Sequence, residues 1–314
     1  MTTTRRAALA LAAGPGLAQE GRPLTLVVPF PAGSVTDNVA RALGQQLQDI
    51  LGQPVVVDNR PGAQGTLAAA HVARSAPDGQ VLLVGSSVMF VAGSLIRGLA
   101  YDPVASFTPV SGVGATSLMF ISRAGSPIAD LAGLTARARR PGPPLSIGYG
   151  SPTAQVVVAL FTAASGTQPT AVAYRGTPQA ITDLVAGHLE SAVVDMGTGL
   201  AQARAGQVRA LALSAARRSP MAPEIPVLQE AFPAAELALE TIIAVLGPAR
   251  MPAAAVQRLD AAVQAALQRP AMRERLEGLA TTPLPLSHTA LEARIRTDNA
   301  KWEALIRQAG IEPE

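Results

Sequence analysis

The sequence contains no cysteine among its 314 residues. This absence excludes thiol nucleophiles, disulfide bonds and zinc sites built from cysteine. It leaves the compartment open, because a chain of this length can bury a large core without covalent cross-links. The three histidines, His71, His188 and His288, lie far apart, and no two of them have the spacing of metal ligands. We therefore expect no metal site and no cofactor.

Aromatic and charged residues are also scarce. Aromatic residues make up 3% of the chain, which argues against a stacking platform for nucleic-acid bases. The formal net charge is only +3, and Lys301 is the only lysine. The densest basic cluster, Arg137, Arg139 and Arg140, lies beside prolines and is typical of a solvated loop. We expect no nucleic-acid partner.

Long apolar runs are missing as well. No stretch after the N-terminus reaches the ~20 apolar residues that a membrane-spanning helix needs. At the N-terminus, Arg5 and Arg6 precede an apolar run at 7–13, and small residues follow at 16–18. This layout predicts a secretory signal peptide over 1–18 and a soluble mature protein in the periplasm. The alternative is an N-terminal arm that only frays.

What the chain does contain is 48% hydrophobic residues, enough for two domains of ordinary size or one large one. Short apolar runs alternate with amphipathic stretches. The pattern predicts strands at 24–28, 55–57, 81–84, 145–149, 171–174, 192–194, 209–213 and 241–246. It predicts helices at 37–51, 67–74, 155–164, 177–187 and 252–268, and a final helix that carries Leu291, Ile295, Trp302 and Ile306.

This alternation implies mostly parallel sheets flanked by helices. We read it as two α/β lobes between which the chain crosses twice, near 119–122 and near 240–244. Lobe 1 would comprise 19–122 with 241–314, and lobe 2 would comprise 123–240. Asp37 and Thr177 are expected to cap helices at their N-termini, whereas Gly52 and Gly187 are expected to end them.

Each candidate parallel strand runs into a loop of small, polar or glycine residues. These loops lie at 30–37, 60–65, 85–87, 150–153, 175–177 and 195–198. In open α/β sheets, ligands bind beyond the carboxyl ends of the strands, and the helix N-termini there favour an anion. The loops therefore predict a cleft suited to a carboxylate. The competing interpretation is that the glycines only make tight turns.

Individual side chains indicate less about the ligand than the loops do. Asp195 ends a strand of lobe 2, where it could bind a ligand or cap a loop. Arg60 and Arg175 could pair with a carboxylate or lie on the surface. A Gly-x-Ser-x-Gly elbow and a P-loop lysine motif are both absent, so nothing in the sequence marks an enzyme.

The loops resemble the signatures of the Bug family, the substrate-binding components of tripartite tricarboxylate transporters. The matching segments are 29–33 (PFPAG) with Asp37 and Ala40-Arg41, 59–65 (NRPGAQG), 76–79 (APDG), 174–176 (YRG), 206–212 (GQVRALA), and 223–226 (PEIP) with Glu230-Ala231. They occur in the right order, and the resemblance covers about 24–311.

The resemblance implies a two-lobed periplasmic-binding-protein-like α/β fold with two crossovers. It also implies a small carboxylate ligand: a di- or tricarboxylate, an acidic amino acid or an aromatic acid. Carried over to this sequence, the ligand-binding residues would be Phe30, Ala32, Gly33, Ser34, Asp37, Ser86, Ser87, Ser151, Thr153, Gly176, Thr177 and Asp195. The sequence departs from the family's pattern at Ser34, where a second glycine is frequent, and after Ser151, where the stretch is shortened.

The resulting expectation is a monomeric receptor that captures a small organic acid and delivers it to membrane transporter subunits. A ligand-sensing receptor for a membrane signalling partner is the alternative. An exported hydrolase is a third, weaker reading, because it would require a nucleophile and a base brought together from distant positions.

Overall fold

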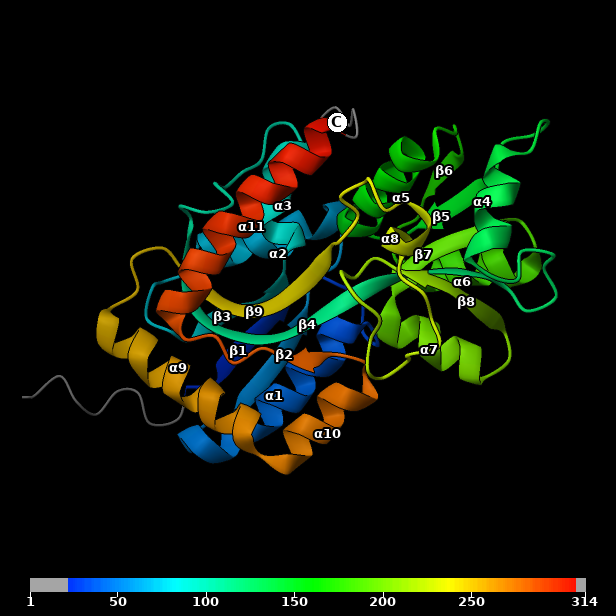
Figure 1. Cartoon of the computed structure of the whole chain (residues 1–314). Coiled ribbons are helices and arrows are strands. Elements are labelled where there is room, and N and C mark those ends of the chain that lie inside the picture. Colours follow the sequence, from blue (N-terminus) through cyan, green and yellow to red (C-terminus); the bar gives the residue numbers. More distant parts are fainter. Residues whose placement is uncertain (1–21, 309–314) are drawn as a thin grey trace, which may run out of the picture.

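The computed structural model describes residues 22–308 of the chain (Figure 1), so the predicted signal peptide lies outside the described residues. The helices are α1 (Val35–Leu51), α2 (Thr66–Ala73), α3 (Val88–Leu95), α4 (Leu131–Arg139), α5 (Pro152–Ser165), α6 (Thr177–Ala186), α7 (Met196–Arg204), α8 (Leu228–Ala231), α9 (Ala253–Gln268), α10 (Pro270–Gly278) and α11 (His288–Gln308). The strands are β1 (Leu24–Val28), β2 (Val55–Asn59), β3 (Val81–Ser86), β4 (Phe107–Arg123), β5 (Ser146–Tyr149), β6 (Thr170–Ala173), β7 (Ser191–Asp195), β8 (Val208–Leu213), β9 (Glu240–Pro248) and β10 (Thr282–Pro283).

The strands follow the order β2-β1-β3-β9-β4-β7-β5-β6, and β8 and β10 also pair with β4. We call β2, β1, β3, β9, β10 and the start of β4 the first half-sheet. The end of β4 with β7, β8, β5 and β6 is the second half-sheet. The pairs β1–β2, β1–β3, β5–β6 and β5–β7 are parallel, as the alternation of strands and helices predicts.

Two antiparallel strands, β4 and β9, were not predicted in this form. β4 pairs with β9 up to Ser117 and with β7 from Leu118 onward, so the same strand belongs to both half-sheets. The return passage lies just before β9, where the Leu239 amide still bonds to the carbonyl of Ser214. Figure 1 shows β4 and β9 running side by side from the first half-sheet toward the second. The division into lobes at 122 and 241 stays a proposal.

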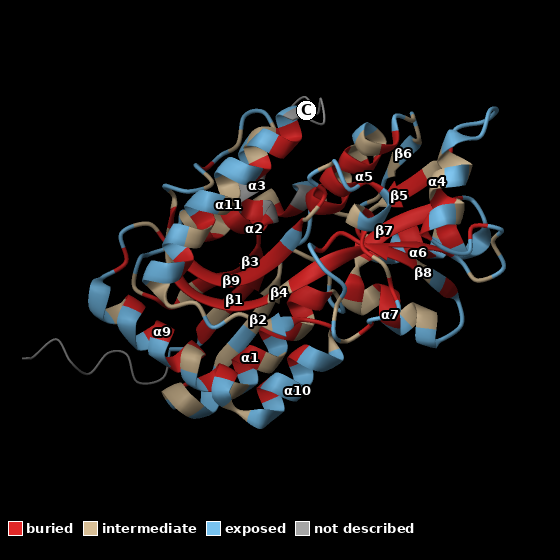
Figure 2. Cartoon of the chain, in the orientation of Figure 1, coloured by how far each residue is buried: buried red, intermediate tan, exposed pale blue. Residues whose placement is uncertain are grey.

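Helices cover both faces of each half-sheet. Buried side chains of α1, α9 and α10 pack on one face of the first half-sheet, and those of α2 and the first part of α11 pack on the other. In the second half-sheet, α4, α5 and α8 cover one face, and α6 and α7 cover the other. The inner strands β1, β3, β4, β7 and β9 are mostly buried (Figure 2), which explains why β1, β3, β7 and β9 contain continuous apolar runs, whereas the edge strands β2 and β6 stay partly exposed.

The expected helix ends are confirmed at the C-termini and wrong at two N-termini. Gly52 and Gly187 end α1 and α6 in the left-handed conformation, with φ of 65° and 85°. The N-cap of α1 is Ser34 rather than Asp37, because the Ser34 hydroxyl reaches the Asp37 amide at 3.2 Å. Thr177 is the first residue of α6, and Gly176 precedes it as the N-cap. The N-caps of α1 and α6 therefore lie three residues and one residue before the predicted positions.

Candidate functional site

A cavity of about 530 Å³ lies between the two half-sheets. The first half-sheet contributes the β1–α1 loop, the first turn of α1, the end of β3 and residues of β4 and β9. The second contributes the loops that follow β5 and β6, the end of β7, and residues of α6 and α7. The N-termini of α1, α5, α6 and α7 thus all reach one cavity, and each brings unpaired N–H groups and a partial positive charge.

The first turn of α1 offers free amide donors. The Ser34 N–H donates to the carbonyl of Pro31 at 3.2 Å, and the Asp37 N–H donates to the Ser34 hydroxyl. Val35 and Thr36 are the first two residues of the helix, so their N–H groups have no carbonyl acceptor within it. Within residues 22–308 they have no other acceptor. Val35 and Thr36 both line the cavity. These two amides form the clearest anion-binding position in the chain.

The Asp37 side chain lies outside the cavity lining and stabilises this turn. Its side chain is 2% exposed and accepts hydrogen bonds from the Gly33 amide at 2.8 Å and from Asn59 at 2.8 Å. Arg41 adds an ion pair at 3.0 Å. Burial opposes ionisation of Asp37, but the hydrogen bonds from Arg41, Gly33 and Asn59 outweigh it and lower the pKa of the carboxyl below its ordinary value. Asp37 is therefore an ionised anchor that fixes the β1–α1 loop to β2.

Within residues 22–308, three buried polar atoms of the cavity wall have no hydrogen-bond partner. Ser86 Oγ at the end of β3 and Thr241 Oγ1 in β9 belong to residues that are only 2% and 4% exposed. Gln202 Oε1 on α7 is also buried without a donor. A buried polar atom without a hydrogen bond costs roughly 1–3 kcal/mol. Because all three residues line the cavity, a polar ligand would supply the missing partners.

Asp195 is the acidic residue of the wall. It ends β7, precedes α7 and lines the cavity half-buried. Burial raises the pKa of its carboxyl to about 6, against only a hydrogen bond from its own backbone. An aspartate that faces a cavity and has a pKa near neutral pH is typical of a functional site.

Gly150 sets the second wall. A Cβ at this position would lie 2.3 Å from the Gly176 carbonyl carbon and 2.3 Å from the Thr177 nitrogen. Glycine alone lets the β5–α5 loop approach the start of α6 this closely. A Cβ at Gly176 would lie 3.7 Å from Pro31 of the β1–α1 loop. The two walls of the cavity therefore meet at Gly176 and Pro31.

Nine of the twelve predicted binding residues line the cavity. They are Phe30, Gly33, Ser34, Ser86, Ser151, Thr153, Gly176, Thr177 and Asp195. The other three, Ala32, Asp37 and Ser87, lie outside the lining.

The structure gives each of the outlying residues a different position. Ala32 is exposed and Asp37 lies behind the loop, whereas the Ser87 hydroxyl accepts from the Ile242 amide at 3.0 Å. The two arginines also lie outside the lining, since Arg60 pairs with Asp58 at 2.7 Å and Arg175 is exposed. Direct binding by any of the twelve predicted residues stays a prediction.

Sequence reasoning missed the lining from β4, β9 and the helix interiors. The additional residues include Thr116, Ile181, Thr182, Val185, Gln202, Gln207, Thr241 and Ile243. Thr116 and Thr241 are cross-strand partners, and a hydroxyl within an apolar strand was the available signal. On α6, Ile181 and Val185 are four residues apart on one face, and Val185 is 38% exposed. In a sequence, that spacing is typical of a helix face that packs into the core.

A second polar cluster contains a serine, an aspartate and a histidine but does not form a catalytic triad. Asp260 accepts from the Ser111 hydroxyl at 2.9 Å and contacts His288 Nδ1 at 3.0 Å. The aspartate stands between the other two, whereas a triad needs the histidine between serine and aspartate. Burial opposes ionisation of Asp260, but hydrogen bonds from His288, Ser111 and Gln264 lower the pKa of its carboxyl. The cluster joins β4, α9 and the start of α11.

Two α/β half-sheets joined by two strands, with a polar cavity between them at helix N-termini, define a two-part solute-binding protein. The sequence profile described as "Tripartite tricarboxylate transporter family receptor" matches residues 39–311. The chain belongs to this family. Because it is a receptor family, the chain is a solute-binding protein and not an enzyme.

The relatives agree over nearly the whole chain. Protein BugT of Bordetella pertussis is 31% identical over 294 residues, which cover 92% of this chain and 90% of BugT. A protein from the tcbD-tcbE intergenic region of Pseudomonas sp. strain P51 is 30% identical, covering 98% of this chain and 90% of its own length.

Solved structures also match nearly the whole chain. The periplasmic binding protein BugD superposes with a TM-score of 0.87 at 28% identity, covering 94% of this chain and 99% of BugD. MatC from Rhodopseudomonas palustris gives 0.84 at 30% identity, covering 91% and 99%. The resemblance and the α/β fold of periplasmic-binding-protein type are thereby confirmed. Within the described residues no helix is both long and apolar enough to cross a membrane.

Proposed function

We propose that the chain captures a small organic acid in the cavity between its half-sheets, with the ligand's carboxylate at the N-terminus of α1. The observation that carries this proposal is the pair of free amides of Val35 and Thr36, which face a cavity lined also by unpartnered hydroxyls. Amide donors that are fixed in place bind an anion without the cost of ordering long side chains.

Two relatives support an acid as ligand. MatC was solved with bound malate, and a second R. palustris protein, with a TM-score of 0.89 at 28% identity over 95% of this chain and 100% of its own, was solved with adipate. Both ligands are small carboxylates. The family further supports delivery to membrane transporter subunits from the periplasm, and the predicted signal peptide would provide export. We propose that the protein acts there as a monomer.

The first test is a thermal-shift screen of the purified protein with di- and tricarboxylates, amino acids and aromatic acids. An acid that binds should stabilise the fold by about 2.7 kcal/mol at ~100 times its dissociation constant. If neutral sugars or cations shift the melting curve and no acid does, the proposal is wrong.

The second test places the carboxylate. Proline is tolerated at the first residue of a helix and removes one N–H. Ser34 has φ of −65° and ψ of 160°, which a following proline accepts. Val35→Pro should therefore weaken binding of an acid about ten- to a hundredfold, because it deletes one charge-assisted hydrogen bond.

The matched control is Val35→Ala, which trims the same side chain and keeps the amide. Titration calorimetry on both variants separates lost packing from a lost donor. Equal affinities of the two variants would remove the α1 N-terminus from the binding site.

A further inference from the structure

The charges around the cavity are one-sided. Among the described residues that line it, Asp195 is the only side chain with an ionisable carboxyl, and none is a lysine, an arginine or a histidine. The carboxylate that we place at α1 is held by helix amides. A second ligand carboxylate near α7 would face Asp195, and only the partial positive charge of the α7 N-terminus, with no basic side chain, would offset the repulsion.

Asp195 belongs to a face of α7 that offers acceptors. Asp195, Thr198 and Gln202 are spaced by three and four residues, so they lie on one side of the helix, and all three line the cavity. Among the described residues, the buried Oε1 of Gln202 has no donor, and the Asp195 side chain has no donor outside its own backbone. We call Asp195, Thr198 and Gln202 the acceptor face.

The Asp195 carboxylate and the Gln202 Oε1 can only accept, so a ligand that satisfies them must bring hydrogen-bond donors. A protonated amine supplies three N–H donors and a positive charge, which offsets the cost of burying a carboxylate. The cavity is also lined by apolar side chains, among them Phe30, Ile181, Val185 and Ile243. Methylene groups of a ligand would pack there.

We propose that the ligand is an amino carboxylate, with its carboxylate at the N-terminus of α1 and its protonated amine on the acceptor face. The inference rests on the proposed function and narrows it. Carboxylate and amine then each meet an opposite partial or full charge, and Gln202 gains its missing donor. A dicarboxylate of the same length meets the same first end but is repelled at the second.

The test is titration calorimetry at pH 7.5 with matched pairs: 4-aminobutyrate against succinate, 5-aminopentanoate against glutarate, and 6-aminohexanoate against adipate. For at least one chain length the amino acid should bind ten times more tightly than the diacid, or better. Asp195→Asn should weaken the amino acid at least tenfold and leave the diacid unchanged or tighter. The control is Asp49→Asn, which makes the same change on the surface of α1, where the side chain is 64% exposed, and should alter neither affinity.

The outcomes separate the two proposals. If the diacids bind more tightly than the amino acids in the unmodified protein, the amino-carboxylate inference is overturned while the proposed function stands. The same holds if Asp195→Asn leaves the preference unchanged. If neither series binds and no other acid does, the proposed function itself fails.

Discussion

Asp195 combines a role at the cavity with a cost to the fold. Burial raises the pKa of its carboxyl to about 6 from the ordinary value of 3.8, so the folded chain holds this proton more tightly than the unfolded chain. The stabilisation from the protonated carboxyl is full below pH 4 and is lost as the pH rises through 6. At neutral pH the ionised, desolvated carboxylate therefore destabilises the ligand-free protein.

Asp195→Asn should consequently stabilise the ligand-free protein at pH 7.5, by about 1–3 kcal/mol, because the amide never has to ionise. Denaturant unfolding at pH 5 and pH 7.5 measures the effect, and the gain should shrink at the lower pH. A gain of the same size at both values would show that the carboxyl is not the cause. A destabilised variant at pH 7.5 would show that the carboxylate contributes a favourable contact in the free protein.

For single residues, sequence patterns identified which residues lie next to the cavity more accurately than the role of each. Nine predicted binding residues line the cavity because small residues at strand ends are a local signal. Asp37 was placed at the right turn, but its carboxylate reaches back to Gly33 and across to Asn59. Only the pairing of β1 with β2 brings Asn59 within reach, and sequence spacing does not contain that information.

Among the elements, the loops after β5 and β6 depend on each other through Gly150. A Cβ there would lie 2.3 Å from two backbone atoms of the Gly176–Thr177 segment, and real Cβ contacts essentially never fall below 3.0 Å. Gly150→Ala therefore has to push the start of α6 away by roughly 0.7 Å or more. We expect this shift to cost about 1–3 kcal/mol of stability and to weaken ligand binding, because Thr177 lines the cavity.

Gly278→Ala is the matched control, because a Cβ there meets nothing within 4 Å. Melting curves and titrations of both variants make the comparison. If Gly150→Ala keeps the stability and affinity of the control, the two loops are not in contact as described.

Element prediction succeeded where the signal was local. β1 begins and ends where the apolar run does, and α1 ends at the expected glycine. β4 was expected only as a crossing segment, because Pro109, Ser111, Gly112 and Gly114 interrupt its apolar pattern. Its register shifts against β9 lie between 109 and 114, so the strand bends where those residues occur. A bent strand shared by two half-sheets leaves no regular period to detect.

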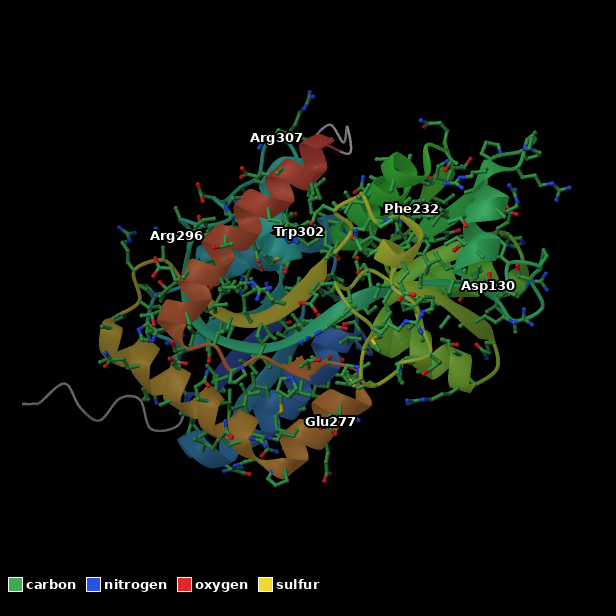
Figure 3. The ribbon with its side chains drawn as sticks, in the orientation of Figure 1. Asp130, Phe232, Glu277, Arg296, Trp302 and Arg307 are labelled. Carbon is green, nitrogen blue, oxygen red and sulfur yellow. The ribbon has the colours of Figure 1, made fainter. Side chains whose placement is uncertain are left out.

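At the scale of the whole molecule, α11 ties the first half-sheet to the core of the second. Leu291 and Ile295 pack with the first half-sheet, whereas Trp302 and Leu305 pack with the core of the second. Figure 3 shows Arg296 on the outer side of α11 and Trp302 on the side toward the rest of the chain. Together with β4 and β9, the helix gives the molecule a third physical link between its halves.

Trp302→Ala tests this link. The side chain is 3% exposed, so its removal should cost about 3–5 kcal/mol, because the cavity left behind refills only in part. Since the lost contacts belong to the core of the second half-sheet while α11 is anchored on the first, both halves should melt earlier in scanning calorimetry. Arg296→Ala is the control on the same helix, because its side chain is 70% exposed, and it should leave the melting curve unchanged. A Trp302→Ala curve in which one part melts at the original temperature would mean that α11 does not couple the halves, and that β4 and β9 alone hold them together.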